Sequence, residues 1–481
     1  MASKRLFQLI AAVEDQPGVV ADGLIALGNA KILVSDPQIT MERTTFDRQI
    51  NRSSLTPLTS LEGVVEATCT FRVEMAGTST AGAAPDWSLL LRACGLRERE
   101  FATYPISSQS GNAFYSGERV SGASSGSGEV VHDTWNGATM MYAVDSAVIG
   151  NLTGDNSGAT ATLGSKTAQQ GWCWTPRTRP VVVLNGTFDT GASSFAAGDI
   201  LIGETSGAIF QVLTAETTAQ SVEVYILDPG TFIFAGESLQ NTSGDNVMTL
   251  DGTGSFINNS EVPSLSLAVI EDGPQRILKG CRGSVTFAAN LGEPMFMDFS
   301  FRGLVHANTD GQLSGTPAPN AKVPPSFLEI GYGVANDSPV VAPADMHEPC
   351  INSWSLAFEN DVSIEKCAAS TDGTRGAAML VGRTVTGSFD PSVRPEASFP
   401  FLENMRNGTI FRQRLTLGDT AANQFHLSVP ACKLTSEGGG DRDGVATRDL
   451  QFSASGRAEN ETDYEDREFT LTYHQDAVYT D

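Results

Sequence analysis

Alternating apolar and polar positions predict two copies of one β-rich unit along this chain. Residues 65–75 alternate between apolar side chains and charged residues or threonine, which is the period of a strand with one buried face. A short helix is predicted directly afterwards, over residues 85–95 (PDWSLLLRACG). In the second half the same order recurs: a strand that begins at Ile351 (INSWSLAFEND), a strand GRTVTGSFDP, and a helix over residues 398–408 (SFPFLENMRNG).

Both predicted helices carry residues that suit helix ends. A proline stands near the first turn of each and a glycine follows the last turn, where the backbone groups lack helical partners. Each copy then returns to paired strands, CRGSVTFAAN with PMFMDFSFRG in the first and FHLSVPACKL with ATRDLQFSASG in the second. The sequence therefore indicates a fused dimer of one module.

Turn dipeptides such as Asn-Gly and Asp-Gly separate the short alternating runs, which predicts a mainly β, antiparallel protein with few helices. Residues 147–262 differ in texture, being poor in charge and rich in Gly, Thr and Ser. Three similar units recur there: VIGNLTGDNSGATATLG, GDILIGETSGAIFQVL and GESLQNTSGDNVMTLDG. Each joins a short apolar strand to a second strand through a polar Ser-Gly turn, which predicts a small inserted all-β domain.

These patterns divide the chain into three parts. Module 1 is predicted to comprise residues 1–146 together with 263–317, and module 2 residues 318–481. Each is predicted to be an antiparallel β-sandwich or barrel with one short helix. The Pro/Gly-rich segment 308–325 is expected to link the two modules, and the insertion spans residues 147–262.

The charge of the chain argues against a nucleic-acid-binding surface. The net charge is −25, from 31 Lys and Arg against 56 Asp and Glu, and no basic cluster offers itself to phosphates. The seven cysteines are odd in number and widely spaced, which favours reduced core thiols and assembly in a cytosol. Glu14 and Asp15 interrupt the short apolar run at the amino terminus, so an export signal is not expected. No stretch reaches the roughly 18 apolar residues of a membrane span.

Candidate catalytic patterns fail on their surroundings. Residues 122–126 fit G-x-S-x-G, but no apolar strand precedes them and no helix follows, so a linker is expected. His426 is out of phase with its apolar neighbours in QFHLSVP, which predicts a solvent-facing side chain. Trp172 and Trp174 share one face of a strand, which most often packs a core, with a sugar-stacking platform as the alternative. The pattern indicates no enzyme, metal site or cofactor.

The chain resembles siphophage major tail tube proteins over both modules but not over the insertion. The segments that carry the resemblance are SLTPLTSLEGVVEATCTFRVEM with PDWSLLLRACG and LKGCRGSVTFAANLGEPMFMDFSFRGL in module 1, and VGRTVTGSFDP with LTLGDTAANQFHLSVPACKLTSEGGGDRDGVATRDLQFSA in module 2. The resemblance implies a sandwich module flanked by one helix, joined edge to edge into rings of six modules. The duplication and the insertion depart from the family pattern.

The resemblance implies a virion structural protein. Two fused modules would close as a homotrimeric ring with pseudo-sixfold symmetry, and the insertion would decorate the outside. The implied partners are further copies of the chain, a tape measure protein in the lumen, and tail terminator and tail-tip proteins at the ends. DNA would transit the lumen without specific binding, and no membrane is involved. The expected location is the virion tail, after assembly in the host bacterial cytoplasm.

A long polar loop is the candidate contact between rings. The segment DRQINRSSLTPLTSLEG has 17 residues, where two to five connect most hairpins. A mobile solvent loop is the alternative. The counterpart in module 2 lies near residue 370. The predicted contact residues are Asp47, Arg48, Arg52, Leu55, Pro57, Leu58, Asp372 and Arg375.

Two other functions remain open on the sequence alone. The chain could be a receptor- or carbohydrate-binding tail or surface protein, in which the insertion and Trp172 with Trp174 recognise a glycan. A β-solenoid polysaccharide hydrolase would need paired carboxylates on neighbouring coils, and the sequence places none.

Overall fold

The structure is a computed structural model of the chain. It describes residues 7–14, 18–21, 24, 31–46, 61–80, 82–110, 114, 119–122, 127–131, 139–144, 151–154, 158–164, 169–176, 181–188, 199–205, 207, 209–212, 221–228, 236–241, 246–250, 262–271, 274–310, 322–334, 346–366, 374–394, 400–418, 423–455 and 468–475.

The protein is mainly β, which confirms the prediction from the alternating pattern. The described residues contain two short helices, α1 (Ser88–Ala93) and α2 (Phe401–Asn407), one in each predicted module. The αL glycine Gly408 ends α2, as the helix-stop signal in the sequence indicates. Of the helices described, none is long and apolar enough to cross a membrane.

The two modules are built from matching strands. Those of module 1 are β1 (Phe7–Val13), β2 (Lys31–Ile32), β3 (Ser35–Phe46), β4 (Leu61–Glu74), β18 (Leu265–Glu271), β19 (Pro274–Asn290) and β20 (Phe296–Asp310). Those of module 2 are β21 (Phe327–Val334), β22 (Ser353–Lys366), β23 (Thr374–Phe389), β24 (Phe411–Leu417), β25 (Gln424–Arg442), β26 (Val445–Ala454) and β27 (Thr470–His474).

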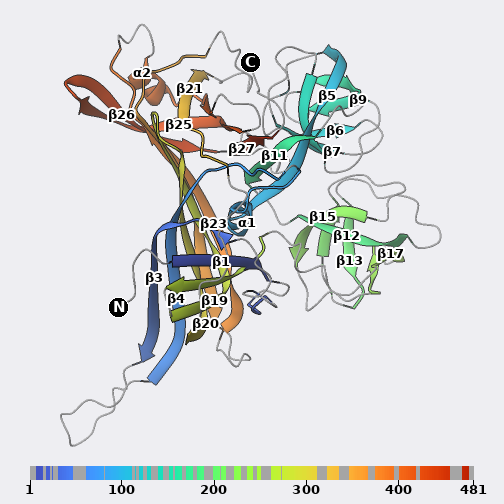
Figure 1. Ribbon diagram of the computed structural model, residues 1–481. Helices are drawn as coiled ribbons and strands as arrows, with labels where there is room; N and C mark the ends of the chain where they lie inside the picture. Colours follow the sequence, from blue (N-terminus) through green and yellow to red (C-terminus); the bar gives the residue numbers. More distant parts are fainter. Residues whose placement is uncertain are drawn as a thin grey trace, which may run out of the picture.

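One long antiparallel sheet runs through both modules in the order β3–β4–β20–β19–β22–β23–β26–β25. Its strands form the tall curved wall in Figure 1. The first halves of β19 and β25 also belong to smaller sheets. In module 1 this sheet is β2–β1–β18–β19, and in module 2 it is β21–β24–β25–β27, extended by β11 (Gln169–Pro176) and β5 (Leu96–Ser110). Each module is thus a β-sandwich.

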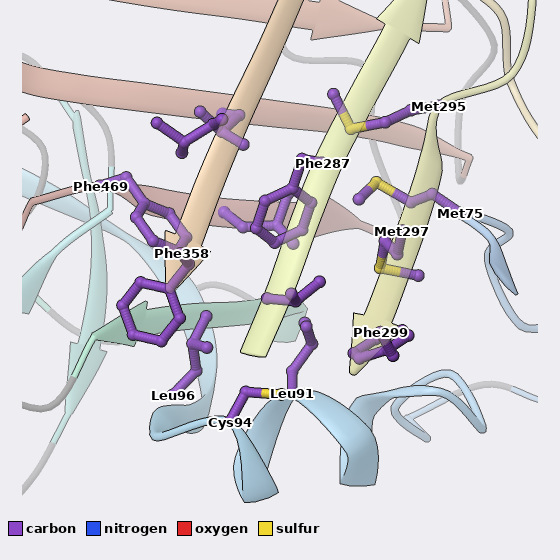
Figure 2. Packing of buried hydrophobic residues seen from close by; sticks show 14 of the residues in the cluster. Met75, Leu91, Cys94, Leu96, Phe287, Met295, Met297, Phe299, Phe358 and Phe469 are labelled. Carbon is purple, nitrogen blue, oxygen red and sulfur yellow. The ribbon is translucent and has the colours of Figure 1, made fainter. Parts of the chain in front are cut away.

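The core lies on one face of the long sheet because the apolar positions of each strand alternate. On β4, Cys69, Phe71 and Val73 are buried, and Phe71 packs against Phe299 of β20 with ring centroids 5.6 Å apart. Helix α1 closes this core from the other side, with Leu91 and Cys94 directed at the strands (Figure 2). The strand predicted to be half-buried therefore is β4, and its apolar positions form part of the module core.

A buried carboxylate holds the bend of β19. The pairing of β18 with β19 is interrupted by a bulge between Leu278 and Cys281, and the carboxylate of Glu14 lies beside it. Its Oε1 accepts bonds from Gly280 N (2.7 Å) and Ser266 Oγ (2.9 Å). Its Oε2 accepts bonds from Gly18 N (2.6 Å) and Ser264 Oγ (2.6 Å). Four donors therefore compensate the cost of burying this charge.

Along the chain, the segment between α1 and β18 forms two small closed rings of six strands each, that is, two small barrels. The first consists of the second half of β5 with β6 (Arg119–Gly122), β7 (Ser127–Val130), β8 (Thr139–Val144), β9 (Asn151–Gly154) and β10 (Thr160–Leu163). The second consists of β12 (Val181–Phe188), β13 (Ile200–Gly203), β14 (Ile209–Val212), β15 (Ser221–Asp228), β16 (Ser238–Gln240) and β17 (Asn246–Leu250). The second ring is the separate body of strands labelled β12 to β17 in Figure 1.

The two rings share one topology. In each, the first strand in chain order pairs with the fourth and sixth, and the second pairs with the third and fifth. The repeated Ser-Gly units of the sequence are the hairpins β9–β10, β13–β14 and β16–β17. Their leading leucines, Leu152, Leu201 and Leu239, are each buried in the core of their ring. The segment between α1 and β18 therefore contains two small barrels of one topology, and only the second lies wholly within residues 147–262.

The strands cross the boundary that the sequence suggested for the insertion. A start at residue 147 falls between β8 and β9, which belong to the same ring. The strand β11 also lies inside residues 147–262, yet it pairs with β27 of module 2 and β5 of module 1. The amino-acid composition changes at residue 147 within a single barrel. A domain boundary is instead set by which strands pair, so composition misplaces it.

The cysteines follow the predicted pattern of thiols in the core. Of the described cysteines, Cys69, Cys94, Cys173, Cys281 and Cys432 are buried and Cys350 is exposed, and none of them forms a disulfide. Burial raises the pKa of the Cys69 thiol to about 12, with Glu271 adding to the effect. The Cys69 thiol is therefore a packing group rather than a nucleophile.

Candidate functional site: two open edges of the long sheet

The modules are joined by a β-sheet junction. Residues 285–290 of β19 pair with residues 353–358 of β22, from Val285 opposite Phe358 to Asn290 opposite Ser353. The ring of Phe287 packs edge-on against Phe469 at 5.7 Å, so the hydrophobic core continues from one module into the next. The junction combines main-chain pairing with aromatic burial.

Polar groups fix the register of this junction. The side-chain amide of Asn360 donates to Cys94 O and to Gly283 O, both at 2.7 Å, and Asn360 N donates to Ser284 Oγ at 2.9 Å. Arg282 reaches across to Ala378 O at 2.7 Å. One-residue slippage would break all of these contacts, because strand side chains alternate between faces.

Cross-strand partners show which strands of the two modules correspond. Hairpin β3–β4 corresponds to β22–β23, and hairpin β19–β20 corresponds to β25–β26. Cys281 and Cys432 each follow a bulge at the same point, opposite Leu265 and Phe411 respectively. By the same reasoning, β20 and β26 match at Phe301 and Phe452, which lie in the same register against β4 and β23.

The correspondence identifies two open edges. Within the described residues, β3 pairs only with β4, although its counterpart β22 pairs on both sides. Likewise, residues 433–442 of β25 pair only with β26, although the matching part of β19 has two partners. The two edge strands of the long sheet are therefore the counterparts of the two strands that pair in the internal junction. β3 corresponds to β22 at one edge, and β25 corresponds to β19 at the other.

The β25 edge has little side-chain bulk. Gly438, Gly439 and Gly440 are consecutive, and a Cβ built on Gly439 meets no atom within 4 Å. The matching residue in module 1 is Phe287, because it lies opposite Met297 of β20 as Gly439 lies opposite Arg448 of β26. The absence of a side chain at Gly439 is not required by the packing of the described residues.

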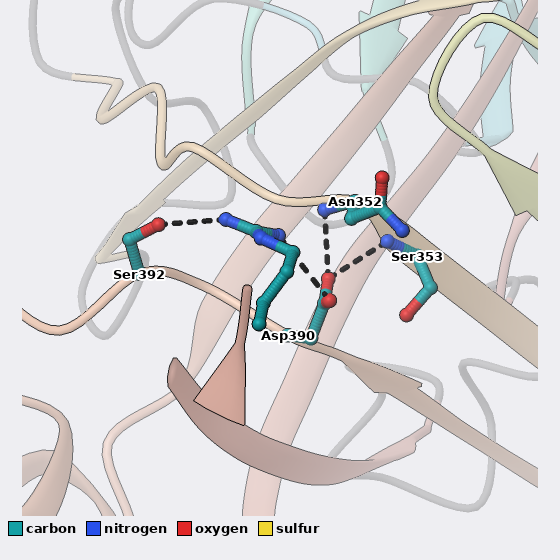
Figure 3. Close-up of polar contacts among 5 residues, drawn as sticks. Asn352, Ser353, Asp390 and Ser392 are labelled. Atoms are coloured by element: carbon teal, nitrogen blue, oxygen red, sulfur yellow. Dashed lines mark hydrogen bonds and ion pairs between the residues drawn. The ribbon is translucent and has the colours of Figure 1, made fainter. Parts of the chain in front are cut away.

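An aspartate network holds the β25–β26 turn to the rest of module 2. Asp390 Oδ1 accepts the backbone N–H groups of Asn352 (2.8 Å) and Ser353 (2.7 Å), as Figure 3 shows. Arg442 Nη1 lies 3.3 Å from Asp390 Oδ2, and its Nη2 donates to Ser392 Oγ at 2.7 Å. The start of β22, the end of β23 and the tip of β25 are thereby fixed together.

The face of the long sheet opposite the core is polar. Arg72 Nε and Asp298 Oδ1 form an ion pair at 2.6 Å across β4 and β20, and the bond to Asp298 raises the pKa of Arg72. Arg302 and Glu66 form a second pair, at 2.5 Å. The remaining positions are mainly hydroxyls and acids: Thr40, Thr68, Thr70, Thr286, Ser300, Ser355, Thr386, Ser388, Ser453, Glu42, Glu74, Glu359 and Asp449.

The predicted inter-ring residues fall almost entirely outside the described residues. These are Asp47, Arg48, Arg52, Leu55, Pro57, Leu58 and Asp372. Arg375 lies in β23, with only its backbone described. The hairpin ends that flank both loops are described. Phe46 pairs with Leu61 and Lys366 pairs with Thr374, at the same end of the sheet, because β3 and β22 run in the same direction.

Two other sequence interpretations meet the structure here. Trp174 is fully buried, donates from Nε1 to Ser88 Oγ at 2.7 Å and packs on Trp87, while Trp172 packs partly buried against the same core. The pair is part of the core rather than an exposed platform. The prediction that His426 faces solvent is wrong: strand β27 and His474 cover it. Burial lowers the pKa of His426 and lowers that of His474 to about 3.

The fold and the edges define a two-module β-sandwich protein whose long sheet ends in two open edges among the described residues, the counterparts of β19 and β22. Among the described residues, no group of three or more histidine, cysteine, aspartate or glutamate side chains could hold a metal ion. No family model matches the chain, and no curated protein matches its sequence.

Proposed function

We propose that the chain is the subunit of a phage tail tube, in which three copies close into a ring and rings stack around a DNA-conducting lumen. One observation carries the proposal. The chain contains one complete module-to-module junction, β19 with β22, and the counterparts of its two halves are open on β25 and β3. Repeating the internal junction between copies would pair β25 of one copy with β3 of the next.

Closure follows from the arrangement of the edges. An interface between two different surfaces of one chain builds a ring when its rotation closes. If the external junction has the geometry of the internal one, every module contributes the same rotation. Three chains then supply the six modules that the resemblance to tail tube proteins implies. A closed sheet also removes both exposed edges, which otherwise template aggregation.

The register of the external junction can be derived from the internal one. Thr286 lies opposite Ala357 in the internal junction. Their counterparts, matched through the cross-strand partners of β20 and β23, are Gly438 and Thr40. We therefore place Gly438 opposite Thr40 of the next copy.

The polar face of the long sheet supports a lumen role. In the proposed ring this face, rich in threonine, serine and carboxylates, lines the channel, while the sandwich core and the two small barrels lie outside it. Phosphates are repelled by acidic groups and gain no counterion release from such a wall. A chain of net charge −25 therefore suits a channel that must not hold DNA.

Both long hairpins begin at one end of the sheet, which supports a stacking role for the loops after Asp47 and before Arg375. Cations at Arg48 and Arg52 would then meet the acidic neighbouring ring. The Trp172 and Trp174 positions, packed in the core, give no support to the carbohydrate-binding alternative.

Native mass spectrometry with negative-stain electron microscopy tests the proposal. We expect rings of three 50.9 kDa chains and tubes of stacked rings. Particles that stay single globules at all concentrations would overturn it, and so would rings of six chains.

A disulfide experiment tests the register. Gly438→Cys with Thr40→Cys is made in a background of Cys350→Ser and Cys367→Ser. Directly opposed strand residues have Cα atoms about 4.5–5.5 Å apart, within the range of a disulfide. Oxidation should give covalent dimers and trimers. The control pair, Gly438→Cys with Thr45→Cys, should not cross-link, since Thr45 lies five residues further along β3.

A further inference from the structure

A groove beside the start of β3 is a surface feature that the proposed ring leaves unexplained. Its volume is about 440 Å³. Its apolar lining comes from Leu33 and Val34 before β3, Trp87 at α1, and Val323 with Pro324 before β21. Leu33 is 54% exposed and Val323 is 82% exposed, so two large apolar side chains meet solvent at one groove.

The internal junction shows what covers the equivalent place in module 2. Ser35 pairs with Arg72, and the residue matching Arg72 in module 2 is Asp390, which binds the backbone of Ser353. Leu33 therefore corresponds to Ile351, two residues before Ser353. Ile351 is only 5% exposed and belongs to the main core.

The start of β22 next to Ile351 is in contact with the β19–β20 turn. Leu291 N, in that turn, donates to Asn352 O at 2.8 Å. The corresponding turn of module 2 joins Arg442 of β25 to Val445 of β26. Among the described residues, no neighbouring module lies against this turn as module 2 lies against the β19–β20 turn.

We infer that the groove seats the β25–β26 turn of a second copy of this chain. This inference rests on the proposed ring and identifies the contact at one end of its interface. Matching Leu291 to Asp443, and Asn352 to Val34, places the turn on residues 33–35 of the neighbouring copy.

The two surfaces agree in chemistry. Val445 is 52% exposed at the turn, and Val393, whose N–H donates to Ala446 O at 2.9 Å, lies beside it. These valines supply apolar surface for Leu33 and Val323 of the groove. Both surfaces carry charges of both signs, so apolar burial rather than net charge selects this contact. Arg442, held by Asp390 and Ser392, presents the turn in a fixed position.

Charge introduction with rescue tests the inference. Leu33→Asp and Val445→Lys each place an ion in the proposed apolar contact, and each should weaken ring formation about tenfold in mass photometry, because an unpaired ion is costly to bury. In the double variant the introduced carboxylate faces the introduced ammonium of the next copy, so association should recover toward the wild-type level. Val381→Asp, on an exposed position of β23, is the matched control and should leave association unchanged.

The outcomes separate this inference from the ring proposal. If Leu33→Asp forms rings as readily as the wild type, or if the double variant associates no more strongly than the single variants, the groove assignment is overturned while the ring proposal stands. Wild-type protein that forms no rings would overturn both. Circular dichroism of each variant checks that the loss is not one of folding. If Leu33→Asp is unfolded, Val445→Lys alone decides: weakened association supports the groove assignment, and unchanged rings overturn it.

Discussion

Replacing Glu14 should destabilise module 1 far more than its place near the amino terminus suggests. The side chain is 2% exposed and accepts four hydrogen bonds, two from backbone N–H groups and two from serine hydroxyls. In Glu14→Ala the hydroxyls can rotate to other acceptors, but Gly18 N and Gly280 N cannot. At roughly 1–3 kcal/mol for each buried donor left without a partner, the variant should lose about 2–6 kcal/mol.

Two milder variants grade the effect. Glu14→Gln keeps one acceptor oxygen, so one backbone donor stays satisfied and the loss should be about half, roughly 1–3 kcal/mol. Ser264→Ala removes one hydroxyl donor and leaves the carboxylate bound to Gly18, so the loss should be about 0.5–1.5 kcal/mol. Glu348→Gln, at an exposed position, should change stability by less than about 0.5 kcal/mol.

Urea unfolding followed by tryptophan fluorescence measures these differences. Trp87, Trp174 and Trp354 are buried in the main core, so they report on its loss. The shift of the midpoint at unchanged slope gives the stability change. A Glu14→Gln variant as stable as Glu348→Gln would refute the reasoning, because it would mean that the bulge of β19 does not depend on the carboxylate.

Two further predictions concern the contact of β27 with its neighbours. His474 is neutral in the fold because burial lowers its pKa to about 3, while unfolding restores a value near 6.5, so its contribution to stability is complete above pH 6.5 and is lost as pH falls from 6.5 toward 3. In His474→Gln the melting temperature should therefore depend less on pH over that window. A pH dependence equal to that of the wild type would contradict the lowered pKa of His474. Gly171→Ala would place a Cβ 1.9 Å from Tyr473 O, so it should cost about 1–3 kcal/mol or more, whereas Gly382→Ala, with only an ordinary contact at 3.7 Å, should be neutral by the same melting measurement.

The local elements of this fold could be predicted from sequence because they rest on local periodicity. Residues 65–75 alternate strictly, and they form the buried and polar faces of β4. Both helices appear where proline and glycine bracket a short apolar run. The Ser-Gly units were visible as a repeat because each is a complete hairpin. Such signals depend only on neighbours along the chain.

The long-range pairings could not be predicted in the same way. Alternation in β19 and β22 suits any partner strand of the same period, so it does not select β22 as the partner of residues 285–290. His426 shows the same limit. Its phase indicates a solvent face, but β25 lies between β24 and β27 there, and the His474 ring covers that face. Glu14 carries a sequence signal only as a break in an apolar run. Gly18 is four residues away, but the other three donors, on Ser264, Ser266 and Gly280, are 250 or more residues away along the chain.

The difference between the internal and external junctions follows from when each one forms. The internal junction forms as the chain folds, so it can rely on a large apolar side chain such as Phe287. The proposed external edges must remain soluble until a second copy arrives, and an open apolar edge would pair with any strand. The β3 edge accordingly carries Asp36 at a positive φ of 49° and Pro37 directly after its first residue, Ser35, and the β25 edge has Gly439 in place of the phenylalanine. On this argument, Gly439→Phe should leave the single chain folded but favour irregular aggregates over rings, because it restores an apolar side chain to an unprotected edge. Light scattering of the variant against Val381→Asp would show the difference, and ordered rings at wild-type yield would contradict it.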